Sequence, residues 1–235
     1  MDTINFEKNG WLLEIGLNGG RILSLSKDGQ NILGTYERID GKMGNTHVCI
    51  PNFAFEGVEK YGFIFHGPFR NSEWKLINQN NYGLEISSGV DGLLVRQFFE
   101  INNEFSQKIL VKNVSNERKR VNVAIHNYWD TEFGWGGSKL NGQDITAGFI
   151  DNPEIKLEKN NTLEIKSKKT INWQVENFKK AKLWTGVKDE NGKRIFDEKY
   201  VCIEPIMNYE GFVETDGSWL EVGKEISLEQ KIGLL

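Results

Sequence analysis

The chain has 235 residues, of which 26% are charged and 38% are hydrophobic, and its formal net charge is -4. This composition excludes a disordered chain and is typical of a folded globular protein. The small negative charge does not favour a nucleic-acid partner. No stretch approaches the ~18 to 20 apolar residues of a membrane span, so no membrane partner is expected.

The chain begins with MDTINFEKNGW, which contains neither the basic nor the apolar region of a secretory signal. Turn signals then recur at the spacing of short strands, and Asp-Gly and Asn-Gly are typical of tight hairpins. These signals are KDGQ near residue 28, GVDG near 90, INNE near 102, SNERK near 116, LNGQD near 142, EKNN near 159 and DENGK near 191. They predict an all-β chain.

Two segments in the first third of the chain hold polar side chains among apolar residues. His47 lies in NTHVCIP, where a capped loop residue is the ordinary interpretation. In FIFHGPFRNSEW, Gly67 and Pro68 predict a sharp turn directly after His66. Arg70 presents a fork of donors suited to hydroxyls or an anion, beside aromatic side chains that suit the apolar faces of a sugar ring. At this point, a purely structural role for His66 is as plausible as a role in a site. A surface ion pair is an equally plausible role for Arg70.

The alternation in RVNVAIHNYWD, residues 120 to 130, is the clearest strand signal in the chain. Val121, Val123 and Ile125 point to one face, and His126 points to the other. If the valines and the isoleucine line the core, His126 faces a polar or concave surface. Tyr128 shares the face of His126, whereas Trp129 falls on the core side.

The last third of the chain repeats this alternation around a carboxylate. VENFKKAKLW, residues 175 to 184, is a weak helix candidate whose end is strand-like. In KYVCIEP, Val201 and Ile203 share one face, and Glu204 lies opposite with Cys202. Burial in this apolar segment would raise the pKa of Glu204. A histidine and such a carboxylate can perform general acid–base chemistry near neutral pH, although a salt-bridged strand residue is the alternative for Glu204.

Neither a linker nor a tandem repeat divides the chain, so we expect a single domain over residues 1–235 that forms a large antiparallel β-sandwich. Cys49 and Cys202 each lie in an apolar run, which predicts buried, reduced thiols and a cytoplasmic protein. No closely spaced metal-ligand motif such as H-x-x-x-H or C-x-x-C is present. The sequence therefore predicts neither a metal nor a cofactor.

Four segments together resemble the aldose 1-epimerases. CIPNFAFEG and YGFIFHGPFRNSEW resemble the family's P-x-F-G and H-G-F-A-R-N-x-x-W elements, and are closest to the hexose-6-phosphate mutarotase-like branch. AIHNYWD resembles the catalytic histidine segment, VCIEP the catalytic glutamate segment, and GGRILSLSKDGQNILG the opening segment. The four occur in family order and span nearly the whole chain. GNTHVCIP departs from the sugar-phosphate branch, with His47 in place of a glycine and no arginine.

The resemblance implies a galactose-mutarotase-like β-supersandwich and an isomerase that interconverts the α and β anomers of an aldohexose or related sugar. Glu204 would be the general base on the C1 hydroxyl and His126 the general acid on the ring oxygen. His66 and Arg70 would bind and polarise the sugar. Asp151 would contact sugar hydroxyls, although a turn-capping aspartate is an equal alternative.

The departure at GNTHVCIP brings His47 into consideration as a further site residue, and Tyr128 as a residue that shapes the site. We expect a sugar or sugar-phosphate substrate and a monomer or weak homodimer. The alternative function is a non-catalytic carbohydrate-binding β-sandwich, in which aromatic residues provide stacking surfaces.

Overall fold

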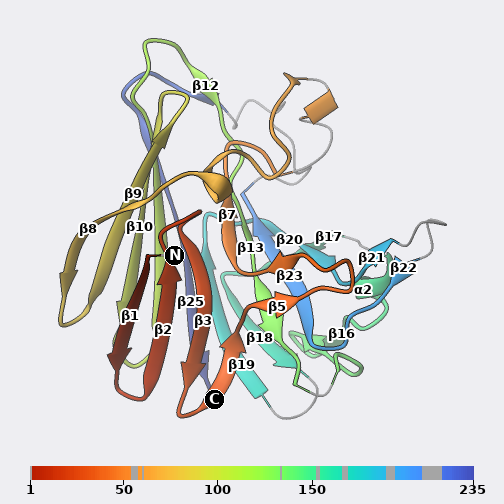
Figure 1. Cartoon of the computed structure of the whole chain (residues 1–235). Helices are drawn as coiled ribbons and strands as arrows, with labels where there is room; N and C mark the ends of the chain where they lie inside the picture. The colour runs from red at the N-terminus through yellow and green to blue at the C-terminus, as the bar shows by residue number, and fades with distance from the viewer. Residues whose placement is uncertain are drawn as a thin grey trace.

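A computed structural model describes residues 2–53, 58–59, 61–132, 134–151, 154–165, 169–188, 194–207 and 219–235 of the chain. Two large antiparallel sheets dominate these residues (Figure 1). The strands of the ten-stranded sheet are β1 (Thr3–Lys8), β2 (Trp11–Gly16), β3 (Arg21–Lys27), β4 (Gln30–Leu33), β14 (Tyr128–Asp130), β23 (Tyr200–Ile206), β13 (Ala124–His126), β7 (His47–Cys49), β20 (Lys180–Trp184) and β17 (Glu154–Lys156).

The nine-stranded sheet is formed mostly by the middle and the end of the chain. In spatial order its strands are β16 (Gln143–Asp144), β15 (Lys139–Leu140), β18 (Asn160–Ile165), β19 (Lys169–Glu176), β25 (Glu225–Leu234), β11 (Phe105–Asn113), β10 (Leu93–Ile101), β9 (Gly83–Val90) and β8 (Lys75–Asn80). The C-terminal strand β25 lies in the middle of this sheet, between β19 and β11.

Short elements complete the described architecture. Three two-stranded pairs are formed by β5 (Tyr36–Glu37) with β6 (Met43–Gly44), β12 (Lys119–Arg120) with β24 (Trp219–Leu220), and β21 (Val187–Lys188) with β22 (Arg194–Ile195). The helical elements with described bounds are the 3-10 turn η1 (Phe69–Asn71) and the one-turn helix α2 (Gly148–Asp151). None of the described helices is long and apolar enough to cross a membrane.

The main hydrophobic core is formed by side chains of both sheets. Trp129 of the ten-stranded sheet meets Trp173 of the nine-stranded sheet at a ring-centroid distance of 5.5 Å. Ile125 and Ile203 belong to the same core cluster as Phe99. Burying apolar area between two sheets is the main stabilising term of a sandwich. The predicted all-β antiparallel sandwich is therefore confirmed.

Three of the predicted Gly-containing turns form two-residue hairpin loops. They join β3 to β4, β9 to β10 and β15 to β16. Both residues of each loop have positive φ, with values of 50° and 80° at Asp28 and Gly29. This geometry matches the right-handed twist of the flanking strands. The turn predicted at DENGK, residues 189 to 193, lies outside the described residues.

The helix considered for residues 175 to 184 is wrong. The segment is the end of β19, a turn and the whole of β20, and only its strand-like end was predicted correctly. Asn177 has a φ of 64°, and its side chain donates a hydrogen bond to the Ser227 carbonyl at 2.8 Å. The chain reverses here because an asparagine tolerates the left-handed conformation that a helix interior excludes.

Candidate active site

The strand that carries His126 is broken by one residue. Asn127 separates β13 from β14, and its backbone N–H donates to the Ile125 carbonyl at 3.0 Å. His126 and Tyr128 therefore lie on the same face, where their rings stack at 4.9 Å with an interplanar angle of 14°. Ile125 and Trp129 point into the main core. The predicted division of this segment between two faces is confirmed.

The second face, which was expected to be a polar or concave surface, is buried. His126 is 6% exposed and Tyr128 is 2% exposed, so the face opposite the main core is itself covered. Period-two alternation tells which side chains share a face, but tertiary packing decides whether that face reaches solvent. The histidine therefore lies in a low-dielectric environment, where electrostatic interactions are stronger than in water.

Strand β23 brings Glu204 to His126. Ala124 lies opposite Ile206 and Tyr128 lies opposite Cys202, so His126 is the cross-strand neighbour of Glu204 in the same register. The Nε2 atom of His126 lies 3.5 Å from the Oε1 atom of Glu204, and the carboxylate side chain is 3% exposed. The sequence predicted that each of these residues lies on the face of its strand opposite the apolar side chains. The structure joins them as a pair.

His47 joins this pair from the other side. The register of β7 and β13 places His47 opposite His126, and the two rings stack at 5.0 Å. The Nδ1 atom of His47 lies 2.8 Å from the Asn45 carbonyl, which can only accept, so Nδ1 carries the hydrogen. Nε2 is then the nitrogen with the lone pair. A role for His47 as a loop residue away from the site is excluded by this placement.

His66 reaches the cluster through the predicted turn. Its backbone is left-handed, with a φ of 63°, and Gly67 follows with a φ of 72°. A Cβ atom on Gly67 would lie 1.8 Å from the Ile50 carbonyl oxygen, so only glycine allows this close approach. The His66 ring lies 5.1 Å from the His126 ring, and its Nδ1 atom lies 3.3 Å from the Cys49 sulfur. All three histidines of the chain thus converge.

Arg70 lies in η1, next to this turn. Its Nε atom is buried without a hydrogen-bond partner among the described residues. Its positive charge lowers the pKa of His47, His66 and His126, although burial has a larger effect on each. Asp151 ends α2, and α2 contacts β20, but its side chain lies outside the described part of the structure.

Three site residues on β20 and β5–β6 were not predicted. Lys182 lies opposite Glu204 in the register of β20 and β23. The ring of Trp184 lies 5.8 Å from that of His126, edge to face. Arg38, between β5 and β6, places its guanidinium 5.2 Å from the centroid of the Trp184 ring. Alternation in KAKLW places Lys182 and Trp184 on one face, but no sequence signal makes β20 the neighbour of β23.

Burial sets the protonation of the cluster. It raises the pKa of Glu204 to about 8, although the charge of Lys182 partly opposes the shift. Burial also lowers the pKa of His47 to about 3 and that of His66 to about 2. Burial, helped by its two histidine neighbours, lowers the pKa of His126 well below its usual value. At neutral pH the cluster therefore contains neutral imidazoles and a protonated Glu204 carboxyl.

Several buried polar atoms in the cluster lack a hydrogen-bond partner within the described part of the chain. They are His126 Nδ1, Glu204 Oε2 and His47 Nε2. Leaving a buried polar group unpaired costs about 1–3 kcal/mol, so native proteins rarely retain one without a use. Three such atoms on neighbouring residues indicate a ligand-binding site. The arrangement can exchange protons with hydroxyl groups and donate hydrogen bonds to them.

Solved structures of galactose mutarotase-like proteins share this fold. Over 100% of both chains, a galactose mutarotase-like protein from Lactobacillus casei matches with a TM-score of 0.75 and 13% identity. A galactose mutarotase related enzyme from Lactobacillus acidophilus matches with a TM-score of 0.74 and 16% identity, over 100% of this chain and 97% of that one. A galactose mutarotase-like protein from Clostridium acetobutylicum matches with a TM-score of 0.71 and 16% identity, over 99% of this chain and 95% of that one.

No protein-family model and no curated protein matches the chain by sequence. The likeness therefore lies in the fold, which is that of the galactose mutarotase-like proteins, as the sequence resemblance implied. It extends over the whole architecture and does not single out the hexose-6-phosphate branch.

Proposed function

We propose that the chain is an aldose 1-epimerase that interconverts the α and β anomers of an aldohexose or related sugar. The observation that carries the proposal is the buried pair of His126 and Glu204, whose facing atoms lie 3.5 Å apart. Mutarotation needs one group to take the proton of the C1 hydroxyl and another to give a proton to the ring oxygen. A paired imidazole and carboxyl supply both functions.

His126 and Glu204 share one transferable proton, which resides on the Glu204 carboxyl in the resting site. Moving it to His126 gives a carboxylate and an imidazolium at the same net charge. Glu204 then accepts the C1 hydroxyl proton while His126 protonates the ring oxygen, and the bond between C1 and the ring oxygen breaks. This step returns the pair to its neutral form. Rotation about C1–C2 and the reverse proton transfers close the ring as the other anomer.

The remaining site residues would hold the sugar. His66 and Arg70 present donors to the ring oxygen and hydroxyls, and His47 Nε2 offers an acceptor for a hydroxyl. Tyr128 stacks on His126 and fixes the plane of its ring. Asp151 would contact sugar hydroxyls, as the resemblance to the aldose 1-epimerases implies. No cofactor takes part in this scheme, and both a free sugar and a sugar phosphate are candidate substrates.

The test is anomer exchange followed by polarimetry or NMR, with fresh α-anomers of glucose, galactose and hexose 6-phosphates. Wild-type protein should accelerate exchange, and Glu204→Gln should lower the catalysed rate by roughly 10²- to 10⁴-fold, since general acid–base groups contribute on that order. Glu158→Gln, at an exposed position, is the matched control and should retain the rate. Full activity in Glu204→Gln would remove Glu204 from the mechanism.

The second candidate function is carbohydrate binding without catalysis. Trp184 and Tyr36 are partly exposed and pack around Tyr200 beside the histidines, where they offer flat faces for a sugar ring. This function predicts sugar affinity in the absence of accelerated exchange. Calorimetry and the exchange assay on the same panel of sugars therefore separate the two candidates.

A further inference from the structure

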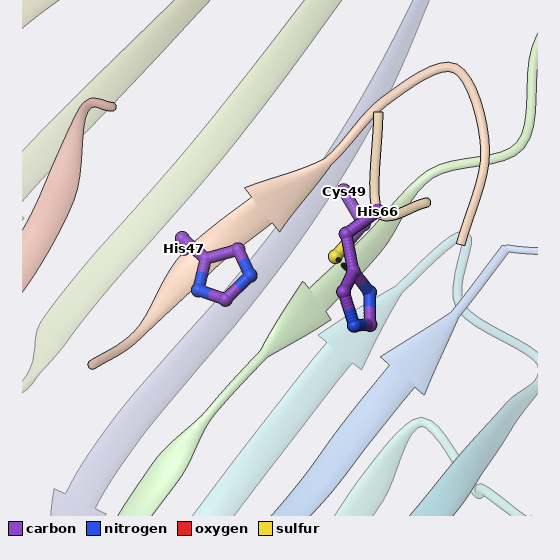
Figure 2. Close-up of side chains that lie close together, drawn as sticks. All are labelled: His47, Cys49 and His66. Carbon is purple, nitrogen blue, oxygen red and sulfur yellow. Dashed lines mark hydrogen bonds between the residues drawn. The ribbon is translucent and has the colours of Figure 1, made fainter. Parts of the chain in front are cut away.

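A second ligand set lies beside the acid–base pair. His47 and Cys49 project from β7, and the turn at His66 brings a second imidazole against Cys49 (Figure 2). The potential ligand atoms of these three residues all lie within 4.8 Å of one another. The three residues are 6%, 0% and 8% exposed, respectively. Two imidazoles and a thiol form a donor set that suits Zn²⁺.

The hydrogen bonding of His47 orients it as a metal ligand. Its Nδ1–H donates to the Asn45 carbonyl at 2.8 Å, which leaves the lone pair on Nε2. That Nε2 atom is buried and has no partner among the described residues. Metal-binding histidines are commonly held in this way, because a backbone carbonyl on one ring nitrogen fixes both the tautomer and the ring orientation.

The contact between Cys49 and His66 is close in length to the spacing of two ligands on a tetrahedral ion. Their Sγ and Nδ1 atoms lie 3.3 Å apart, as the dashed line in Figure 2 marks. Bond lengths of about 2.3 Å for zinc to sulfur and about 2.0–2.1 Å for zinc to nitrogen put two tetrahedral ligands about 3.6 Å apart. Removing the thiol proton would turn this contact into two adjacent ligands. The ligand atoms of all three residues lie within 4.8 Å of one another, so closing of the His47 ring toward the other two completes the set.

We propose that His47, Cys49 and His66 form a Zn²⁺ site with a fourth position open toward His126. Binding exchanges the Cys49 thiol proton for the metal, so one proton is released for each ion bound. The two imidazoles are neutral near pH 7 and release none. Arg70 opposes the cation, so Arg70→Met should tighten binding.

The site can be tested without any sugar. Wild-type protein stripped with EDTA should bind one equivalent of Zn²⁺ in calorimetry and release about one proton. Co²⁺ in its place should give a sulfur-to-cobalt charge-transfer band in the near ultraviolet. His47→Gln should weaken binding at least tenfold, and Cys49→Ser should abolish the band. Circular dichroism and thermal unfolding of each variant establish that it is folded.

Cys202→Ser is the matched control, because Cys202 is the other buried free cysteine of the same sheet. It belongs to a neighbouring set with His126 and Glu204. The proposal requires that Cys202→Ser keep the charge-transfer band. Absence of binding in wild-type protein, or loss of the band in Cys202→Ser with retention in Cys49→Ser, would overturn it.

The outcome is separate from that of the epimerase proposal. Metal binding is measured directly, and exchange is measured in EDTA. If both proposals hold, Zn²⁺ should slow exchange by engaging His66 and His47, and EDTA should restore the rate. Zinc binding without any exchange activity would support the metal site and remove the enzyme function.

Discussion

Glu204 and His126 titrate as a pair, because their facing atoms lie 3.5 Å apart in a buried site. Burial favours the neutral form of both groups, which raises the pKa of Glu204 to about 8 and lowers the pKa of His126. Protons leave such a pair in macroscopic steps that belong to both residues. In the proposed mechanism, the single proton retained between those steps is the one that moves during anomer exchange.

His66 is held in a conformation that costs energy. Its φ of 63° is rare for a residue with a Cβ, at a cost of about 1–2 kcal/mol. Such strain persists where the surrounding structure needs the side chain. Here the strained backbone directs the imidazole toward His126 and Cys49.

Two substitutions of His66 separate the strain from the ring. His66→Gly and His66→Ala both delete the imidazole, but only glycine adopts a positive φ without cost. We expect His66→Gly to be more stable than His66→Ala by about 1 kcal/mol in urea unfolding, and both to lose sugar affinity. Equal stabilities, or a more stable alanine variant, would contradict the strained turn.

Four neighbouring strands present one row of ionisable side chains. Reading across β7, β13, β23 and β20, the row is His47, His126, Glu204 and Lys182. Each residue lies opposite the next in register, so the protonation state of each affects its neighbour at close range. The order of strands in the sheet, more than any single motif, assembles the site.

Lys182 adjusts the pKa of Glu204 from the end of this row. Its charge favours the carboxylate and so lowers a pKa that burial raises to about 8. Above that pKa the pair loses its shared proton, and exchange should slow. Lys182→Met should therefore move this alkaline limb of the pH–rate profile to higher pH, whereas Lys182→Arg should leave it in place. A shift to lower pH in Lys182→Met would contradict the sign of this interaction.

The sequence predicts the faces of these strands but not their neighbours. The two-residue alternation of a strand correctly places His126 on the face opposite Ile125, and Glu204 on the face opposite Ile203. This alternation depends only on backbone geometry. The register that pairs His47 with His126 joins residues 79 positions apart, and long-range packing determines it. For the same reason Arg38 and Trp184 could not be assigned to the site. The apolar surroundings of Glu204 indicated its burial, but the burial of His126 could not be predicted, because alternation carries no information about what covers a face.

The whole molecule maintains three histidines in neutral form, and this affects its stability. Burial lowers the pKa of His47 to about 3 and of His66 to about 2, and lowers that of His126 as well. Below about pH 6.5 the unfolded chain binds protons at these residues while the folded chain does not, so acid favours unfolding. Glu204 acts oppositely, because its raised pKa makes the folded chain bind the extra proton between about pH 4.5 and 8.

The histidines outnumber the carboxyl, so the free energy of unfolding should fall by roughly 3 kcal/mol between pH 6.5 and 5. Urea unfolding at the two pH values measures this difference. His47→Gln removes one of the three histidine contributions and should reduce the fall by roughly 1.5 kcal/mol. Stability that is constant or increasing on acidification would show that the histidines are protonated in the folded state.

A buried amide network connects the two sheets beneath the site. The Oε1 atom of Gln230 accepts hydrogen bonds from Asn127 Nδ2 at 3.0 Å and Trp173 Nε1 at 3.1 Å. Its Nε2 atom donates to Gln107 at 2.8 Å and to the Asn127 side-chain oxygen at 3.2 Å. Asn127 is the residue that interrupts β13 and β14, so this network supports the break that aligns His126 with Tyr128.

Gln230→Leu should therefore affect stability and the site together. Leucine fills a similar volume but leaves Asn127, Gln107 and Trp173 with unpaired buried polar groups, at about 1–3 kcal/mol each. We expect a loss of at least about 2 kcal/mol in urea unfolding. Gln79→Leu, on the exposed face of β8, is the control and should change stability by less than about 0.5 kcal/mol.

In the folded fraction of Gln230→Leu, sugar affinity should also fall, because Asn127 no longer has its partner. Since the same glutamine joins β25 to the broken strand, unchanged stability would mean that this network does not help to hold β25 against the broken strand.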